Sequence, residues 1–214
     1  MKRLLCTLIL GMVLTTSAAF ADTITETGGF GLTPTDFSIP IPIAQFDPTL
    51  GTLDSITFTL TGQTSGQGTV TNNSGNTGTY TVDLFTSLTL LDPSLATLLT
   101  NNPTFSTTLT IADGASGTAT GVSPLTTQSL TITSGFAPYL GTGDATFTVA
   151  GTGEATVTGP TAFSVTSTTS GLATLTVDYN FTPVPEPPVL WGYVGFGMVV
   201  SGVAFYRKRR MQRQ

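Results

Sequence analysis

Alternation of threonine with aliphatic and aromatic residues is the feature that most restricts how this chain can fold. Ile56, Phe58 and Leu60 are separated by threonines, and the longest such run covers residues 173–181. A period of two places alternate side chains on opposite faces of a β-strand, and β-branched threonine suits the solvated face. Each of these segments therefore predicts a strand that is buried on one side only.

Shorter alternating segments continue along the chain. Their apolar positions are Tyr80, Val82 and Leu84; Leu109 and Ile111; Leu130 and Ile132; Phe147 and Val149; and Phe163 and Val165. Turn-forming residues separate them at 72–76, at Asp113-Gly114 and at 141–143. About nine to ten short strands without crossover helices predict an all-β domain over residues 22–182, an antiparallel β-sandwich of the jelly-roll kind.

Two segments predict local departures from this plan. Residues 141–159, GTGDATFTVAGTGEATVTG, contain an internal echo that predicts a hairpin turning at 151–153. Residues 92–103, DPSLATLLTNNP, place Pro93 near a helix start and Asn101-Asn102 as a stop, which predicts one short helix.

The charges are divided between the ends of the chain and its body. All seven basic residues lie at positions 2–3 and 207–213, whereas all twelve acidic residues lie between Asp22 and Glu186. Residues 22–206 therefore contain no basic residue and carry a net charge of -12. A body with this charge repels the phosphates of nucleic acids, so DNA or RNA binding is excluded as a function.

Few kinds of catalytic site can be built from the body. The chain has no histidine, and its single cysteine, Cys6, lies close to the N-terminus. A Ser-His-Asp triad, a lysine nucleophile, a His/Cys zinc site and an arginine clamp on phosphate are all excluded. Paired carboxylates remain as an alternative for a hydrolase, but the acidic residues show no telling grouping. We expect a protein that is not an enzyme and that holds no cofactor.

Calcium is the remaining metal to consider, because carboxylates beside carbonyl-rich glycine turns supply hard oxygen ligands. Asp113 and Asp144 lie in such turns and are the weak candidate ligands. The D-x-[DN]-x-[DN]-G pattern does not occur, so a role in capping turns and keeping the domain soluble is the favoured interpretation.

The first 21 residues have the three parts of a secretory signal peptide. Lys2-Arg3 is followed by an apolar run over residues 4–14 and by Ala19-Phe20-Ala21, an A-x-A cleavage pattern. We expect a signal helix here that is removed by signal peptidase after Ala21, with Ala19 and Ala21 as the recognised small residues.

The C-terminal end predicts a membrane-spanning helix. Residues 189–206 are 18 residues without charge, and a helix of this length reaches about 27 Å, close to the thickness of a bilayer core. A basic tail, residues 207–214, follows it. Its cluster of positive charges predicts a cytoplasmic stop at Arg207, Lys208, Arg209 and Arg210.

The sequence Val184-Pro185-Glu186-Pro187, followed by one hydrophobic helix and an arginine-rich end, resembles the PEP-CTERM sorting signal of Gram-negative bacteria. The likeness covers residues 183–214. It implies recognition by exosortase, a membrane cysteine protease and transpeptidase, with Pro185, Glu186 and Pro187 as the motif in the substrate. X-Pro bonds hold Glu186 extended and non-helical, which is compatible with access by a protease.

A second resemblance begins at Phe46-Asp47-Pro48-Thr49-Leu50-Gly51-Thr52-Leu53. With the alternating strand after it, this sequence is similar to the choice-of-anchor E domain, found in bacterial exported proteins with alternative anchors. The likeness extends from about Thr23 to LTVDYNFTP near Pro183, and it implies no catalytic or binding residues. From the residues alone, Asp47-Pro48 predicts a turn, with Phe46 and Leu53 closing the edge of the core.

These features together lead to one expected function and an alternative. The leading hypothesis is an exported, exosortase-processed protein of the cell surface or extracellular matrix, first anchored by its C-terminal helix, whose β domain is structural or adhesive. The alternative is a carbohydrate- or calcium-dependent binding module within the exopolysaccharide layer.

Overall fold

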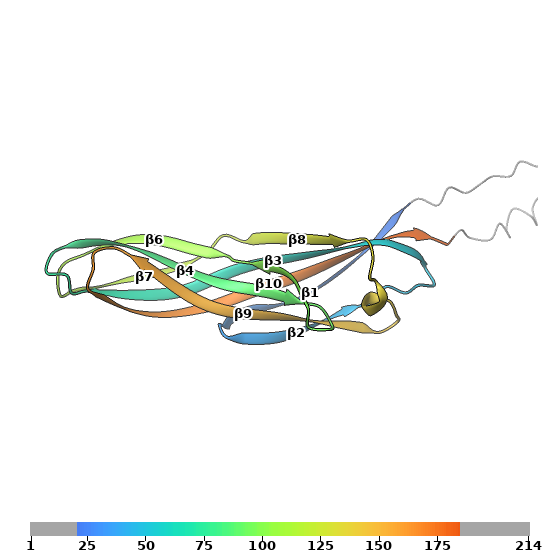
Figure 1. Cartoon of the computed structure of the whole chain (residues 1–214), viewed down its shortest axis with the longest axis horizontal. Helices are drawn as coiled ribbons and strands as arrows, with labels where there is room; N and C mark the ends of the chain where they lie inside the picture. The colour runs from blue at the N-terminus through green and yellow to red at the C-terminus, as the bar shows by residue number, and fades with distance from the viewer. Residues whose placement is uncertain (1–20, 185–214) are drawn as a thin grey trace, which may run out of the picture. The chain divides into compact units, whose positions relative to one another are not determined.

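A computed structural model describes residues 21–184 of the chain. It contains ten strands and one short 3₁₀ helix, so the prediction of an all-β domain of nine to ten strands is confirmed (Figure 1). The elements are β1 (Asp22–Pro34), β2 (Phe37–Ala44), β3 (Gly51–Asn72), β4 (Gly78–Leu91), β5 (Thr97–Asn101), β6 (Thr104–Ile111), β7 (Ser116–Val122), β8 (Thr126–Ile132), η1 (Ala137–Tyr139), β9 (Asp144–Thr158) and β10 (Phe163–Pro183). The expected signal helix and C-terminal helix lie outside the described residues.

No helix within the described part of the chain is long and apolar enough to cross a membrane.

The strands form two antiparallel sheets that pack face to face. Sheet A has the order β1-β10-β3, with β7 and β8 both pairing with the far side of β3; sheet B has the order β2-β9-β4, with β5 and β6 both pairing with β4. When β5 with β6 and β7 with β8 are each counted as one interrupted strand, eight strands remain. The order in which these eight strands pair within the two sheets is that of a jelly roll.

The alternating sequence explains which side chains form the core. Ile56, Phe58 and Leu60 on β3 are fully buried, as are Leu175 and Val177 on β10, while the threonines between them face outward. The buried residues form two clusters along the sandwich: a basal cluster that includes Phe58 and Phe147, and a distal cluster around Tyr80 and Val82.

A belt of buried polar side chains separates the two clusters: Thr64, Thr86, Asn101, Ser123 and Thr169. The Asn101 side chain donates to the carbonyls of Leu60 and Thr126, at 3.0 and 2.8 Å. The Ser123 hydroxyl accepts from the Thr64 amide at 2.9 Å. These bonds replace the backbone hydrogen bonds of the β-ladder at the level where β5 ends and β6 begins, and where β7 ends and β8 begins. Within the described residues, Thr86 Oγ1 is the buried side-chain oxygen that has no hydrogen-bond partner.

The predicted helix at 92–103 is wrong. The carboxylate of Asp92 accepts hydrogen bonds from the amides of Ser94 and Ala96, both at 2.8 Å, and this closes a tight turn with Leu95 at φ 67°. The chain then extends, and Thr97–Asn101 pairs with β4 as strand β5. A local side-chain bond of this kind competes with helix formation, and pairing with β4 decides the outcome.

The predicted hairpin at 151–153 is also wrong, because β9 continues without a turn from Asp144 to Thr158. Gly151 and Gly153 sit in the strand because other side chains occupy the space above them. A Cβ on Gly151 would overlap the ring of Phe37, and one on Gly153 would overlap the hydroxyls of Thr35 and Thr169. The echo in the sequence therefore marks a close approach of β9 to the β1–β2 turn and β10.

Both ends of the described domain lie at its base. Asp22, the first residue of β1, pairs with Phe181 near the end of β10. The predicted turn at Asp47 also lies at the base, and the carboxylate of Asp47 accepts a hydrogen bond from the Thr49 amide at 2.9 Å. Phe46 and Leu53 are buried, as expected, and the ring of Tyr139 stacks on Phe147.

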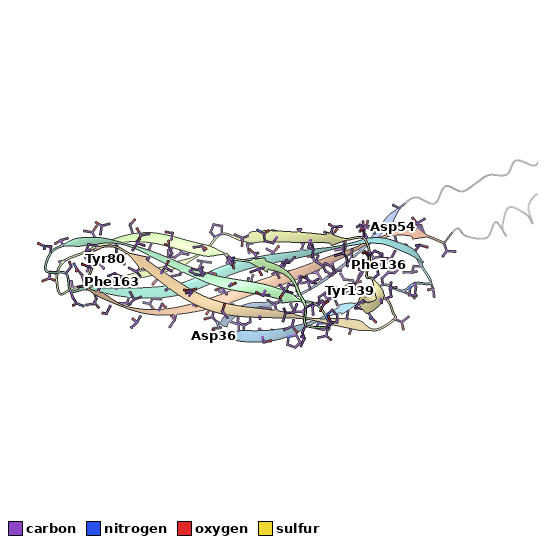
Figure 2. All side chains as sticks on the ribbon, viewed as in Figure 1. Asp36, Asp54, Tyr80, Phe136, Tyr139 and Phe163 are labelled. Atoms are coloured by element: carbon purple, nitrogen blue, oxygen red, sulfur yellow. The ribbon has the colours of Figure 1, made fainter. Side chains whose placement is uncertain are left out.

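The distal end, or tip, contains the turns 73–77, 112–115 and 159–162. In Figure 2, Tyr80 and Phe163 mark the tip, whereas Phe136 and Tyr139 mark the base. β3 spans this distance with 22 residues, which corresponds to about 70 Å at the rise of a β-strand.

Candidate functional site

Most of the sorting residues predicted from the sequence lie outside the described residues. These are Ala19 of the signal cleavage site; Pro185, Glu186 and Pro187 of the sorting motif; and Arg207, Lys208, Arg209 and Arg210 of the basic stop. Ala21 is described and is exposed, immediately before β1.

The two candidate calcium ligands are not brought together. Asp113 lies in the turn between β6 and β7 at the tip, where its carboxylate accepts a hydrogen bond from the Gly75 amide at 2.8 Å. Asp144 begins β9 at the base, opposite Ala44. Among residues 21–184, no group of three or more acidic, histidine or cysteine side chains is placed to hold a metal ion.

Asp47 and Asp92 act as turn residues in the same way as Asp113. At Asp47, hydrogen bonds from Thr49 lower the pKa of the carboxyl. At Asp92, burial works toward a higher pKa, but the bonds from Ser94 and Ala96 outweigh it and the pKa is lowered. Both carboxylates thus stabilise local backbone and do not converge on a ligand site.

One regular surface feature is the outer face of sheet A, which we call the hydroxyl face. At its basal end, β1, β10, β3 and β8 align in three rows of four residues, ten of which are threonine or serine. These rows are Thr25, Asp178, Thr57, Thr131; Thr27, Thr176, Thr59, Ser129; and Gly29, Thr174, Thr61, Thr127. We call this set the basal block.

A second set, the distal block, covers β10, β3 and β7 toward the tip. Eight of its nine residues carry hydroxyls: Thr168, Gln67, Thr120; Thr166, Thr69, Thr118; and Ser164, Thr71, Ser116. Along a strand the hydroxyls repeat every two residues, about 6.7 Å, and across strands every 4.8 Å or so. The face is thus a two-dimensional array of methyl and hydroxyl groups.

Hydrogen bonds between neighbouring strands hold many of these hydroxyls in place. On the basal block, Thr57 pairs with Thr131 at 2.9 Å and Thr59 with Ser129 at 3.0 Å. On the distal block, Thr71 pairs with Ser116 at 2.7 Å. Each hydroxyl can donate one bond and accept two, so a paired hydroxyl keeps bonding capacity toward an outside molecule. Because its rotamer is already fixed, binding orders it at little entropic cost.

The hydroxyl face is almost free of charge although the molecule is strongly acidic. Residues 21–184 include eleven of the twelve acidic residues and no basic one. On this face the carboxylates are at the basal end, where Asp178 accepts from Thr25 at 2.6 Å and Asp54 accepts from Thr182 at 2.8 Å. Asp83 on β4 and Glu154 on β9 face outward on sheet B instead, where Glu154 stands opposite the half-buried Phe85.

Exposed apolar side chains interrupt the hydroxyl face at mid-length, between its two blocks. We call them the mid-face patch: Leu32, Pro34, Val122, Leu125 and Leu172. Leu32, Val122 and Leu125 are 50%, 50% and 61% exposed, and Leu172 is half-buried. Beside the patch, within the distal block, is an open hollow of about 130 Å³ that is lined by Gln67, Thr69, Thr166, Ser167 and Thr168.

Sequence reasoning missed the hydroxyl face and its patch as a site. The alternation placed threonines on solvated faces but carried no information about which strands stand side by side. One signal was available for the patch: Leu172 stands where the alternation in β10 calls for a hydroxyl, and Gly31-Leu32 and Pro124-Leu125 break the alternation.

Comparison with known proteins adds little. No family model matches this chain, and no curated protein matches it. Among solved structures, it is similar to the infectious bursal disease virus Gx strain structure (9% identity, 84% of this chain and 48% of that chain, TM-score 0.22) and to the VP2 subviral particle of the same virus (10% identity, 90% and 55%, TM-score 0.23). The chain spans about half the length of these proteins, and TM-scores this low carry no argument about function.

Proposed function

We propose that this protein is an exported, non-enzymatic display module of a Gram-negative cell surface or extracellular matrix. In this proposal residues 1–21 direct export and are removed by signal peptidase. Residues 22–182 form the displayed sandwich. Residues 183–214 act as a sorting signal of the PEP-CTERM kind, in which the helix 189–206 anchors the chain until exosortase acts at Pro185-Glu186-Pro187.

The arrangement of the chain ends is the observation that carries this proposal. β1 begins and β10 ends at the same end of the sandwich, where Asp22 pairs with Phe181. A chain held by the residues after Pro183 is therefore held at its base, and the tip turns stand about 70 Å away along the strands. Removal of a leader before Asp22 also leaves the paired part of β1 intact.

The charge of the body supports a display role. Residues 22–182 contain eleven carboxylates and no cation, so copies of the domain repel one another and an anionic membrane surface. Such a domain remains separate and hydrated at a crowded surface, which suits a module that extends from its anchor.

The proposal is tested by localisation and processing in a Gram-negative host that carries an exosortase. The full chain is expected to lose its C-terminal segment, seen as a size shift, and to reach the surface or medium. Glu186→Ala is expected to remain uncleaved and in the inner membrane, whereas Glu154→Ala, which removes an exposed glutamate from sheet B, is the matched control and is expected to behave as wild type. A wild-type chain that stays uncleaved in the inner membrane would refute the sorting role.

A further inference from the structure

The mid-face patch is unusual because apolar side chains occupy positions where the rest of the hydroxyl face carries threonine or serine. Pro34 and Val122 end one continuous row, Pro34–Ser170–Ser65–Val122, that crosses all four strand positions of sheet A. Isolated exposed leucines are common on protein surfaces, but five apolar residues close to one level of a face otherwise built of hydroxyls need a reason.

Irregularities on both edges of sheet A place Leu32 and Leu125 in the next row toward the base, which contains Leu172. On β1 the register shifts between Phe30 and Thr33, so that Gly31 and Leu32 together stand opposite Leu172. Leu172 pairs with Gln63, and across β3 the interruption between β7 and β8 places Pro124-Leu125 at the same level. β-bulges commonly re-aim side chains at functional positions.

The result is a band across the sheet with apolar groups at both ends and amide and hydroxyl groups in its middle. Three strand spacings give it a length of about 15 Å. Threonines of the basal block border it on one side: Thr174, Thr61 and Thr127. Thr168, Gln67 and Thr120 border it on the other, next to the hollow of about 130 Å³.

A chain of sugar rings has the matching chemistry, since each ring presents apolar C–H faces and a rim of hydroxyls. The leucine, valine and proline side chains can cover C–H faces, while the ordered hydroxyls and the amides of Gln63 and Gln67 exchange hydrogen bonds with the rim. We infer that the mid-face patch and its bordering rows form a binding site for a neutral polysaccharide.

Charge selects the neutral class of glycan. The described domain has a surplus of eleven carboxylates and no lysine or arginine, so a polymer of uronic acids or sulfated sugars is repelled. A second copy of the chain fits less well. It brings the same surplus of eleven carboxylates without a cation, so two copies repel each other.

This inference deepens the adhesive part of the proposed function, and its biological setting rests on that proposal. The binding itself does not depend on export, because Phe20–Pro183 separates from the rest of the chain as a compact unit and contains every described strand and both cores. Failure of sorting and failure of glycan binding are therefore distinguishable with this domain in isolation.

The test is native affinity electrophoresis of the domain 22–183 in gels that contain dextran, mannan, a β-1,3-glucan or alginate. At least one neutral glycan is expected to retard the wild-type domain, and alginate is not. Leu32→Ser with Leu125→Ser is expected to weaken the retardation at least fivefold. The control, Leu50→Ser with Leu95→Ser, removes two leucines that are 45% and 67% exposed elsewhere and is expected to bind as wild type.

Circular dichroism of both double variants establishes that they fold. Lack of retardation by all three neutral glycans would overturn the inference, as would equal retardation by alginate or an equal loss in the control variant. A dimer of the wild-type domain in light scattering that Leu32→Ser with Leu125→Ser dissociates would assign the patch to a second copy and also overturn it.

Discussion

Replacing Asn72 by alanine is expected to destabilise the domain strongly, because this one side chain joins the 73–77 turn to the end of β6 and to Tyr80 on β4. Asn72 is fully buried, and its amide group donates to the carbonyls of Ile111 and Asn76, at 2.9 and 2.7 Å. Its side-chain oxygen accepts from the Tyr80 hydroxyl at 2.6 Å and from the Ser74 amide at 2.9 Å. All four side-chain bonds are lost in Asn72→Ala.

The expected loss of stability in Asn72→Ala depends on which of the four former partners can form a hydrogen bond with water instead. The Tyr80 hydroxyl and the Ile111 carbonyl are partners in buried bonds, and an orphaned buried group costs about 1–3 kcal/mol each. The bonds to Ser74 and Asn76 are only partly buried, so water can replace them at low cost. Together these give a loss of about 3–5 kcal/mol, a large part of the stability of a typical domain.

Urea unfolding of the domain 22–183, followed by far-ultraviolet circular dichroism and tyrosine fluorescence, measures this loss. The domain contains no tryptophan, and its three tyrosines, Tyr80, Tyr139 and Tyr179, are buried. Asn73→Ala is the matched control, because Asn73 is exposed and bonds through its backbone amide to Ala162. Its effect is expected to stay within about 0.5 kcal/mol.

A double-mutant cycle with Tyr80→Phe tests the mechanism. Tyr80→Phe removes the hydroxyl that Asn72→Ala leaves without a partner, so the double variant is expected to be more stable than the sum of the single losses by about 1 kcal/mol or more. A loss below about 1 kcal/mol for Asn72→Ala, or an equal loss for Asn73→Ala, would refute the reasoning.

Three further outcomes are expected. Gly151→Ala should cost about 2 kcal/mol or more in urea unfolding because its Cβ meets the Phe37 ring. Gly31→Ala, where the space is open, should be near neutral, and equal effects would contradict the close packing of Phe37 on Gly151. Burial, followed by the charges of Glu26 and Tyr139, raises the pKa of Tyr179 to about 12. The contribution of the Tyr179 hydroxyl to the free energy of unfolding is therefore complete below pH 10 and is lost as the pH rises toward 12, a loss of about 1–2 kcal/mol after solvent screening. If Tyr179→Phe lost as much stability over this pH range as the wild type, the prediction would be contradicted. Finally, the melting temperature should rise between 10 and 150 mM salt, because screening weakens repulsion among carboxylates that have no cationic partners; a flat response would count against that repulsion.

Most of the strand positions were predictable from local pattern. In β10 the alternation from Ala173 to Phe181 gave the buried face correctly, because a strand has a side-chain period of two whatever it pairs with. Turn residues such as Asp113-Gly114 were equally readable, since Gly114 adopts φ 72° there. In both cases the cause is within a few residues of the effect.

The errors arose where a distant segment decided the local structure. Residues 97–101 became a strand because β4 offers an unpaired edge, and 151–153 stayed extended because Phe37 and Thr169 pack on the glycines. Asn72 looked like one turn residue among several, and only folding brought Tyr80 and Ile111 to its amide.

The sequence by itself determined that this protein has a half-buried β body with a surplus of carboxylates and no cation, because side-chain period and charge are properties of the chain. It also limited the chemistry that the body can perform. The tertiary structure decided that the threonines of four strands align on one face and that Leu32, Leu172 and Leu125 lie at one level within it. Register between strands is a long-range property, set by which inner faces pack together, so no local pattern could have shown which of these residues lie side by side.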